Sequence, residues 1–266
     1  MNEEGSAEIR EKFMPASLRV QRSNPENLRD NSDETAQIDF RETGQTVANS
    51  LTAAAHELKT PLVLLRQLAF QIDDEKIAAR VKLTSERALR LVDGLTKTAR
   101  LDDGLFALAP LDVRRSLAES LREISPLAAA KNVAIAPPRI SRKLPMAVGN
   151  RELLHAILLN LLDNALDYTR GKIELTVRKK RAELEVCVRD YGEIIEPNEF
   201  KNLAKNLGRR GQILSSRPLS SGLGLMVAGQ MSRAMNGGLT VVRHRRGGLT
   251  FAITLPMIQQ LSLLEM

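Results

Sequence analysis

The sequence contains no tryptophan, two tyrosines and six phenylalanines. Because RNA-reading modules commonly stack bases on aromatic side chains, this scarcity argues against such a module. Hydrophobic residues still make up 43% of the chain and charged residues 27%. This is the balance of a globular protein with an aliphatic core.

Cysteine is almost absent as well. Cys187 stands alone, which excludes an internal disulfide and any metal site built on a pair of cysteines. Its apolar, strand-like surroundings predict a buried thiol. No apolar run reaches the ~18 residues that a membrane span needs, and the N-terminus lacks the apolar stretch of a secretory signal. We therefore expect a soluble, cytoplasmic protein with no membrane span.

The chain is predicted to have four regions. Residues 1–38 are polar and without sustained periodicity, which indicates a flexible arm. Residues 39–104 carry two helical stripes, residues 105–257 mix helical and strand patterns, and residues 258–266 form a short tail.

The second region is predicted to be a helical hairpin. Apolar residues recur in alternating steps of four and three over residues 51–72 and again over residues 77–98, with a polar break at residues 73–74. This is the spacing of a coiled-coil seam. Because one hairpin cannot bury its seam and its flanking apolar positions, we expect a homodimer in which two hairpins form a four-helix bundle.

The third region is predicted to be an α+β sandwich with helices on one face of a sheet. Asp112 is a good N-cap for its first helix. Further helices are expected over residues 151–168 and 223–235, the second ending at the C-cap glycines Gly237 and Gly238. Strands are expected at residues 133–136, 173–178, 184–189, 239–242 and 249–255.

His56 lies in the string HELKTPL on the first predicted helix. A lone helical histidine is most often an ordinary surface residue, but here the neighbours favour chemistry. Glu57 can polarise the imidazole so that its other nitrogen becomes a nucleophile, and Thr60 lies one turn further on the same face. Pro61 removes a backbone hydrogen bond and permits a local bend.

This string resembles the H-box of histidine kinases, and the second helix resembles the other half of their dimerisation and phosphotransfer domain. The resemblance implies that His56 is the phosphoacceptor and Glu57 the base that assists it. It also implies that Thr60 positions water when the domain dephosphorylates its partner.

The string NLLDNALDYT places Asn160 and Asn164 four residues apart on one helix face, with Tyr168 one turn further along. Such a pair is often a plain polar face, but its oxygens can also face Mg²⁺ and phosphates. The string resembles the N-box of the ATPase fold shared by histidine kinases, gyrase and MutL. This implies Asn164 as the Mg²⁺ ligand, Asn160 as its catalytic helper and Tyr168 beside adenine. Asp167 stands where this family commonly has lysine.

Two glycine motifs follow. Asp190 can accept a hydrogen bond from an adenine amino group, and Gly192 lets the backbone approach the ring. Further on, Gly222, Leu223 and Gly224 lead into a helix whose N-terminus offers amide donors and a positive dipole to phosphates. The motifs resemble the two glycine boxes of the same ATPases, which implies that these residues bind ATP.

The segment over residues 197–219 is predicted to be a mobile lid over ATP. Gly208 and Gly211 are its candidate hinges, and Arg209 or Arg210 its candidate phosphate contact. The phenylalanine-rich box that the family has in this segment is reduced to Phe200, and the usual box glycines are replaced by Ile194 and Ser220.

These motifs follow one another over roughly residues 45–256 and predict a sensor-type histidine kinase of two-component systems. Its fold would be a dimeric helical hairpin followed by an α/β-sandwich ATPase domain of the gyrase, MutL and histidine kinase type. With ATP and Mg²⁺ it would phosphorylate its own His56 and pass the phosphoryl group to an aspartate in the receiver domain of a response regulator. No sensor domain is evident ahead of His56, so a separate chain is a candidate sensor partner.

Three other functions remain open. A dimeric signalling scaffold with a decayed ATP site would explain Asp167, Ile194 and Ser220. An ATPase with a conformational output would share the fold but would leave the hairpin without a purpose. Binding to nucleic acid rests on the net charge of +7, which equally suits a membrane surface or a nucleotide, and we do not expect it.

Overall fold

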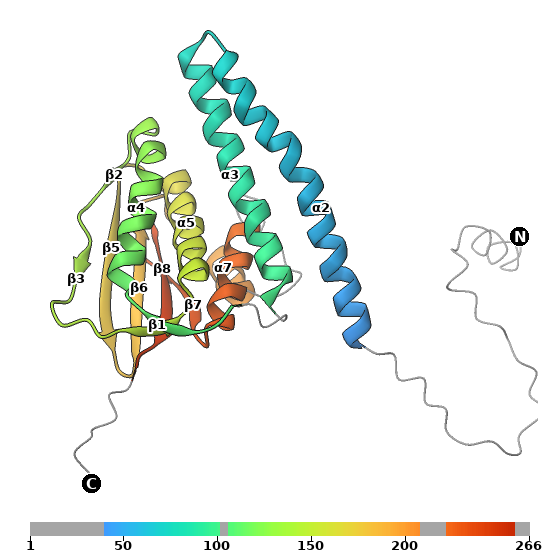
Figure 1. The fold of residues 1–266 in the computed structure, drawn as a ribbon. Helices are drawn as coiled ribbons and strands as arrows, with labels where there is room; N and C mark the ends of the chain where they lie inside the picture. Colours follow the sequence, from blue (N-terminus) through green and yellow to red (C-terminus); the bar gives the residue numbers. More distant parts are fainter. Residues whose placement is uncertain (1–39, 102–105, 208–221, 259–266) are drawn as a thin grey trace, which may run out of the picture. The chain divides into compact units, whose positions relative to one another are not determined.

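The computed structural model describes residues 40–101, 106–207 and 222–258. The described residues from Arg41 onward belong to one compact unit by their contacts. This unit contains a helical N-terminal part and a mixed α/β domain, which confirms the predicted fold class (Figure 1). None of the helices in the described ranges is long and apolar enough to cross a membrane. The predicted arm at residues 1–38 lies outside these ranges, as do residues 259–266 of the predicted tail.

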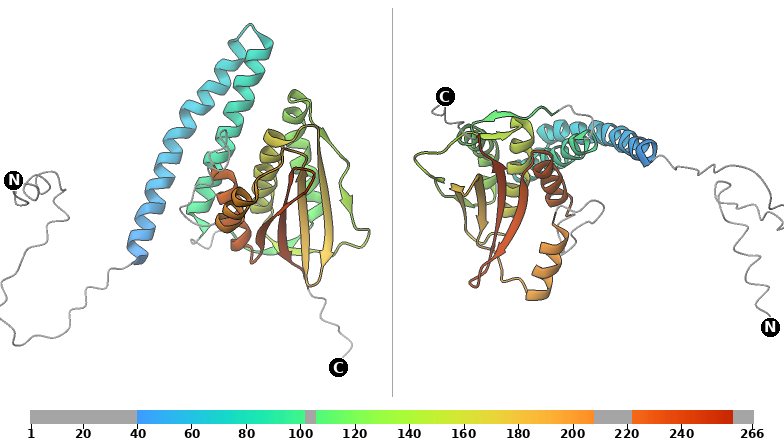
Figure 2. Two further views of the ribbon diagram at one scale, coloured as in Figure 1. Left: turned by 180° about the vertical axis from the view of Figure 1, so that it is seen from behind. Right: turned by 90° about the horizontal axis from the view of Figure 1, so that it is seen from below.

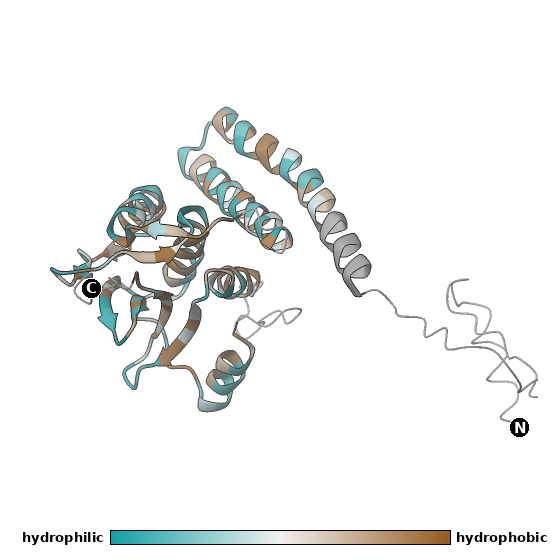
Figure 3. Ribbon diagram, turned by 60° about the horizontal axis from the view of Figure 1, so that its bottom comes forward, coloured by the Kyte–Doolittle hydropathy of each residue, from teal (hydrophilic) through white to brown (hydrophobic). Residues whose placement is uncertain are grey.

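The hairpin consists of α2 (Phe40–Leu68), the short 3-10 helix η2 (Ala69–Gln71) and α3 (Glu75–Ala99). Asp74 ends the polar break and caps α3, because its carboxylate accepts hydrogen bonds from the first-turn amides of Lys76 and Ile77 at 2.9 and 3.0 Å. Pro61 lies inside α2 without ending the helix. The coloured parts of both helices carry a mixture of polar and apolar residues (Figure 3).

Burial agrees with the predicted seam at Ala55 and Ala69 but differs from it along α3. On α3 the buried apolar side chains are Leu89 and Val92, one position away from the predicted Ala88 and Leu91. Large apolar side chains remain exposed along the hairpin, among them Leu58, Leu64, Leu65, Leu68, Phe70 and Ile77. A single chain therefore leaves much of the apolar surface of its hairpin in contact with solvent.

The α/β domain begins after the hairpin. Its helices are α4 (Val113–Ala130), α5 (Arg151–Tyr168), α6 (Pro197–Asn206) and α7 (Leu223–Ala234). Its strands are β1 (Ala109–Leu111), β2 (Ala134–Ile135), β3 (Arg139–Ile140), β4 (Ala147–Gly149), β5 (Lys172–Lys180), β6 (Glu183–Asp190), β7 (Gly238–Arg243) and β8 (Leu249–Pro256).

These strands form a six-stranded sheet in the order β2-β5-β6-β8-β7, with β3 also paired to β5. β2 and β3 run parallel to β5, whereas the other pairs are antiparallel. α4, α5 and α7 cover one face of the sheet (Figures 1 and 2). The core lies between these two layers, where side chains such as Ile157 of α5, Val186 of β6 and Ile253 of β8 are fully buried.

The end of α7 corrects the predicted cap. Asn236, not a glycine, takes the left-handed conformation with φ of 55°. The amide of Gly237 then donates to the carbonyl oxygen of Ser232 at 2.9 Å, which completes a Schellman motif. Gly237 fills the next position, where a Cβ would lie 2.0 Å from the carbonyl oxygen of Thr254. Gly238 already belongs to β7.

Some elements were not predicted. β1, β3 and β4 have two or three residues each, too few to show a period of two in the sequence. The first ten residues of the predicted lid form α6, which starts with Pro197 at a position where proline needs no amide partner. The lid residues from Gly208 onward, including Gly208 to Gly211, lie outside the described residues.

Candidate nucleotide-binding site

α5 carries the two asparagines of the predicted N-box. Asn150 caps the helix by accepting hydrogen bonds from the amides of Glu152 and Leu153. The apolar side chains of α5 are buried, whereas Asn160 and Asn164 are half-buried at the edge of the core. Both asparagines therefore remain available at the surface of the helix that faces α7.

The N-terminus of α7 lies against Asn160. The side-chain amide of Asn160 donates to the carbonyl oxygen of Ala156 at 2.9 Å. Its other terminal atom, Oδ1, lies 3.0 Å from the point where a Cβ would stand on Gly224. Gly222 is the N-cap of α7 with φ of 66°, and it has no side chain that could cap the helix. The structure therefore brings the N-box and the second glycine box together, as predicted.

A small cavity of about 40 Å³ lies at this junction. It is lined by Arg87, Leu91, Asn160, Asp163, Asn164, Gly222, Gly224 and Leu225. Ligand pockets commonly have volumes of ~300–1,000 Å³. The side chains that line this cavity must therefore move before a triphosphate can enter.

Asp190 lies at the end of β6 and is buried. Its carboxylate accepts hydrogen bonds from the amides of Gly192 at 2.9 Å and Leu249 at 3.2 Å, which fix its orientation. A Cβ on Gly192 would lie 2.5 Å from the carbonyl oxygen of Tyr168, so only glycine fits there. The structure thus brings the first glycine box next to the end of the N-box.

The turn between β7 and β8 belongs to this site but was not predicted. Gly247 and Gly248 have φ of 91° and 76°, and a Cβ on Gly248 would lie 2.1 Å from the carbonyl oxygen of Asp190. The signal in the sequence was the glycine pair between two strands. Ile194, which replaces a family glycine, is 63% exposed and has no positive φ, so this replacement strains nothing.

Comparisons with known proteins agree with this geometry. Residues 149–259 match the family model described as histidine kinase-, DNA gyrase B- and HSP90-like ATPase. The chain is 27% identical over 215 residues to sensor protein CutS of Streptomyces coelicolor, covering 77% of this chain and 51% of CutS. It is 29% identical over 234 residues to the probable sensor histidine kinase TcrY of Mycobacterium tuberculosis, covering 84% of this chain and 48% of TcrY. The chain thus resembles sensor histidine kinases over about four fifths of its length, and its residues 149–259 resemble their ATPase domain.

A further relative is the adaptive-response sensory kinase SasA of Parasynechococcus marenigrum, which is 32% identical over 223 residues, or 79% of this chain and 56% of SasA. The chain spans about half the length of the curated relatives it matches. The full-length ShkA structure with AMPPNP covers 79% of this chain and 46% of its own, at 24% identity and a TM-score of 0.58. The structure of Acinetobacter baumannii AdeS matches 77% of this chain and 98% of its own chain, at 18% identity and a TM-score of 0.53. The similarity to these two structures shows that this chain shares their fold.

The H-box predicted from the sequence lies on α2. His56, Glu57 and Thr60 are all exposed there. The ammonium group of Lys59 donates to the carboxylate of Asp93 at 2.9 Å and thereby joins α2 to α3. Because α3 lies between α2 and α5, this chain does not bring the H-box together with the N-box or the glycine boxes (Figures 1 and 2).

Two arginines of α3 contact acidic residues of the N-box, which the sequence did not reveal. Arg90 donates to both oxygens of Asp163, at 3.1 and 3.0 Å. Burial raises the pKa of the Asp163 carboxyl, although the guanidinium of Arg90 acts against this shift. Arg87 forms an ion pair with Asp167, whose carboxylate also accepts a hydrogen bond from Lys131 at 2.5 Å.

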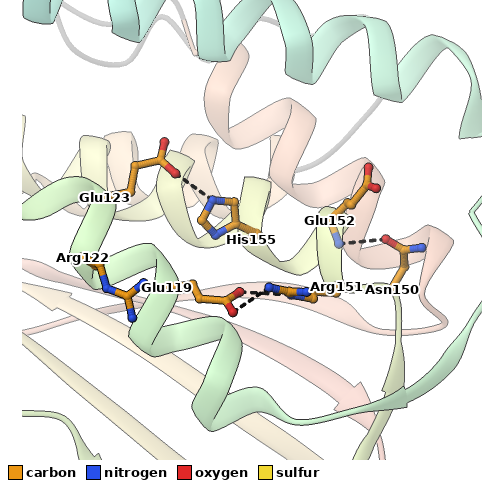
Figure 4. A pocket seen from close by; sticks show the side chains of 7 residues that line it. All are labelled: Glu119, Arg122, Glu123, Asn150, Arg151, Glu152 and His155. Atoms are coloured by element: carbon orange, nitrogen blue, oxygen red, sulfur yellow. Dashed lines mark hydrogen bonds and ion pairs between the residues drawn. The ribbon is translucent and has the colours of Figure 1, made fainter.

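Larger hollows lie elsewhere on the domain. One of about 660 Å³ lies over α4 and α5, and its lining residues are Glu119, Arg122, Glu123, Asn150, Arg151, Glu152 and His155 (Figure 4). There His155 bridges Ser120 and Glu123 at 2.8 and 2.9 Å, so this histidine has a structural role. None of the predicted nucleotide-binding residues lines this hollow, whereas Asn164, Gly222 and Gly224 line the small cavity.

Proposed function

We propose that this chain is a protein histidine kinase that uses ATP to phosphorylate His56 and passes the phosphoryl group to an aspartate of a response regulator. The observation that carries this proposal is the approach of Gly224 to Asn160, which joins the second glycine box to the N-box. Asp190 and Gly192 provide the neighbouring adenine site.

In this proposal adenine lies against Asp190, whose carboxylate is held in place by two backbone amides. Leu223 and the two box glycines beside it place the N-terminus of α7 near the phosphates, where amide donors and the helix dipole favour negative charge. Tyr168 would lie beside the base. Each of these roles follows from the likeness of the motifs, and each can be tested by substituting the residue.

Within the described ranges, no three or more His, Cys, Asp or Glu side chains gather to hold a metal ion. The half-buried amide of Asn164 at the cavity suits Mg²⁺, which accepts few protein oxygens and completes its shell with water and phosphates. When bound there, the ion would neutralise negative charge on the phosphates. Asn160 would help to position the reacting groups.

The transfer step needs little covalent assistance from the protein. A ring nitrogen of His56 would form a bond to the terminal phosphorus as the bond between that phosphorus and the bridging oxygen breaks and ADP leaves. Glu57 would take the proton that the ring loses. In a separate hydrolytic reaction, Thr60 would position the water that attacks the phosphoaspartate of the response regulator and releases inorganic phosphate. The exposure of all three side chains suits access by a separate domain.

The remaining assignments extend the same proposal. The chain would act as a homodimer, because its hairpin leaves apolar side chains exposed. Its division at residues 38, 104 and 257 separates the arm, the phosphotransfer domain, the ATPase domain and the tail. It would work in the cytoplasm with the receiver domain of a response regulator, and a separate chain is the candidate sensor.

Incubation with radiolabelled ATP and Mg²⁺ tests the proposal. We expect the wild type to acquire label that is labile in acid and stable in alkali, and we expect His56→Ala and Asn164→Ala to acquire none. His155→Ala is the matched control, because this histidine also lies on a helix but bridges two side chains. It should be labelled like the wild type, and label that survives in His56→Ala would contradict the proposal.

A dimeric scaffold with a decayed ATP site is the second candidate. Asp167 favours it, because a carboxylate stands where the family commonly has a cation that contacts phosphate. The absence of any Mg²⁺-ATP binding by the wild type, measured by calorimetry, would select this candidate. Binding without phosphorylation would instead point to an ATPase with a conformational output.

A further inference from the structure

Two carboxylates lie close to the proposed phosphate position. Asp163 lines the small cavity, and Asp167 follows one turn along α5. Both repel a triphosphate unless cations offset their charge. Asp167 moreover occupies the position at which a cation would be expected from the motif. A cation from another element must therefore supply what α5 lacks.

Among the described residues that line the cavity, Arg87 is the one cation. It reaches the cavity from α3, together with Leu91 one turn further along that helix. α3 is held close to the site, since a Cβ on Gly94 would lie 3.1 Å from a methyl group of Val227 in α7. Arg87 thus brings a positive charge to the wall of this cavity.

The ion pair between Arg87 and Asp167 can be exchanged at low cost. The Arg87 side chain is 34% exposed, and ion pairs in contact with water contribute little to stability. Lys131 contacts the same carboxylate at 2.5 Å. If Arg87 turns away, Asp167 therefore keeps a positively charged partner.

Arg90 behaves differently although it lies less than one turn away on α3. It holds both oxygens of Asp163, which is buried, and removal of Arg90 would leave that carboxylate without this partner. Arg90 is also absent from the lining of the cavity. It therefore serves as the fixed attachment of α3, whereas Arg87 is the cation that can move.

We propose that Arg87 binds the phosphates of the nucleotide and takes the place of the lysine that Asp167 replaces. On binding, its guanidinium exchanges the carboxylate of Asp167 for phosphate oxygens, to which arginine can donate two hydrogen bonds at once. α3 of the hairpin would then complete the nucleotide site of the ATPase domain. This inference rests on the proposed binding of ATP.

Displacement of a fluorescent ATP analogue by ATP and by adenosine tests the inference on the full chain. We expect Arg87→Gln to weaken ATP binding about tenfold, the loss of a charge-assisted contact, and to leave adenosine binding unchanged. Arg90→Lys keeps the charge near Asp163 and should bind ATP as the wild type does. The double variant with Arg87→Gln and Asp167→Lys should regain most of the lost affinity, because the new lysine restores a cation on α5.

Each other outcome overturns a specific statement. If Arg87 only attaches α3 to α5, Arg87→Gln will open the cavity and bind ATP as tightly as the wild type or more tightly, which refutes the inference. Equal losses of ATP and adenosine affinity would likewise refute a contact with phosphate. A wild type that binds no ATP would refute the proposed function itself, and the inference with it.

Discussion

At the residue scale, Cys187 reports on the folded state. Burial raises the pKa of its thiol to about 11 from the usual value of 9.0. The folded chain thus favours the protonated thiol more strongly than the unfolded chain does. This contribution to stability is fully present below pH 9 and is lost as the pH rises to 11. At pH 11 the loss amounts to about 2 kcal/mol. Between pH 9 and pH 11, the free energy of unfolding measured in urea should therefore fall more for the wild type than for Cys187→Ala.

The same residue offers a simpler test. At pH 8 the buried thiol should react slowly with a thiol reagent in the native protein and quickly in urea, because the thiolate is the reactive form. Fast labelling of the native protein would contradict the burial of this side chain in β6.

Gly248→Ala is expected to destabilise the chain by at least about 2 kcal/mol, since φ is 76° and the added Cβ would meet the carbonyl oxygen of Asp190. The variant should also bind adenosine more weakly, because its turn holds the amide that fixes Asp190. Gly171→Ala is the control, since a Cβ there meets nothing within 4 Å. Denaturant unfolding and nucleotide displacement measure the two effects, and equal behaviour of both variants would be the contrary result.

The contrast between predicted and unpredicted site residues has a physical cause. Asn160, Asn164 and Asp190 could be predicted because each lies in a short motif of neighbouring residues. Arg87 could not, because it lies 80 residues before Asp167 and only the packing of α3 on α5 brings them together. Gly248 likewise gains its importance from a contact with a distant strand.

At the scale of elements, the cap of α3 makes a test of the hairpin. Asp74→Ala removes two hydrogen bonds from first-turn amides and should cost about 1 kcal/mol. Amide hydrogen exchange should rise in the first turn of α3 and stay unchanged in α4. Asp112→Ala removes the corresponding cap of α4 and should give the reverse pattern. Exchange that rises equally in both helices would show that the hairpin and the domain open as one.

The long helices and central strands could be predicted because each shows several periods of its pattern. The limits of α5, for instance, match the prediction, and Asp112 is the cap of α4. The start of α6 could not, since a proline and a polar stretch also suit a loop. The cap at Asn236 was missed because glycine is the commoner left-handed residue and two glycines stood next to it.

At the scale of the whole molecule, the exposed apolar side chains of the hairpin predict association. Light scattering should give the wild type twice the chain mass of 29.4 kDa, and Leu65→Glu should lower this to one chain. Val242→Glu changes an equally exposed apolar residue on β7 and should leave the mass unchanged. A Leu65→Glu variant that stays dimeric would place the interface elsewhere.

The cavity of about 40 Å³ has a consequence for kinetics. Its volume is far below the ~300–1,000 Å³ of common ligand pockets, so the binding of ATP in this cavity requires its lining side chains to move first. In rapid mixing the observed rate of association should level off at high ATP concentration, at the rate of that rearrangement, instead of rising in proportion. The wild type would then respond to the abundance of nucleotide only up to a ceiling set by its own motion.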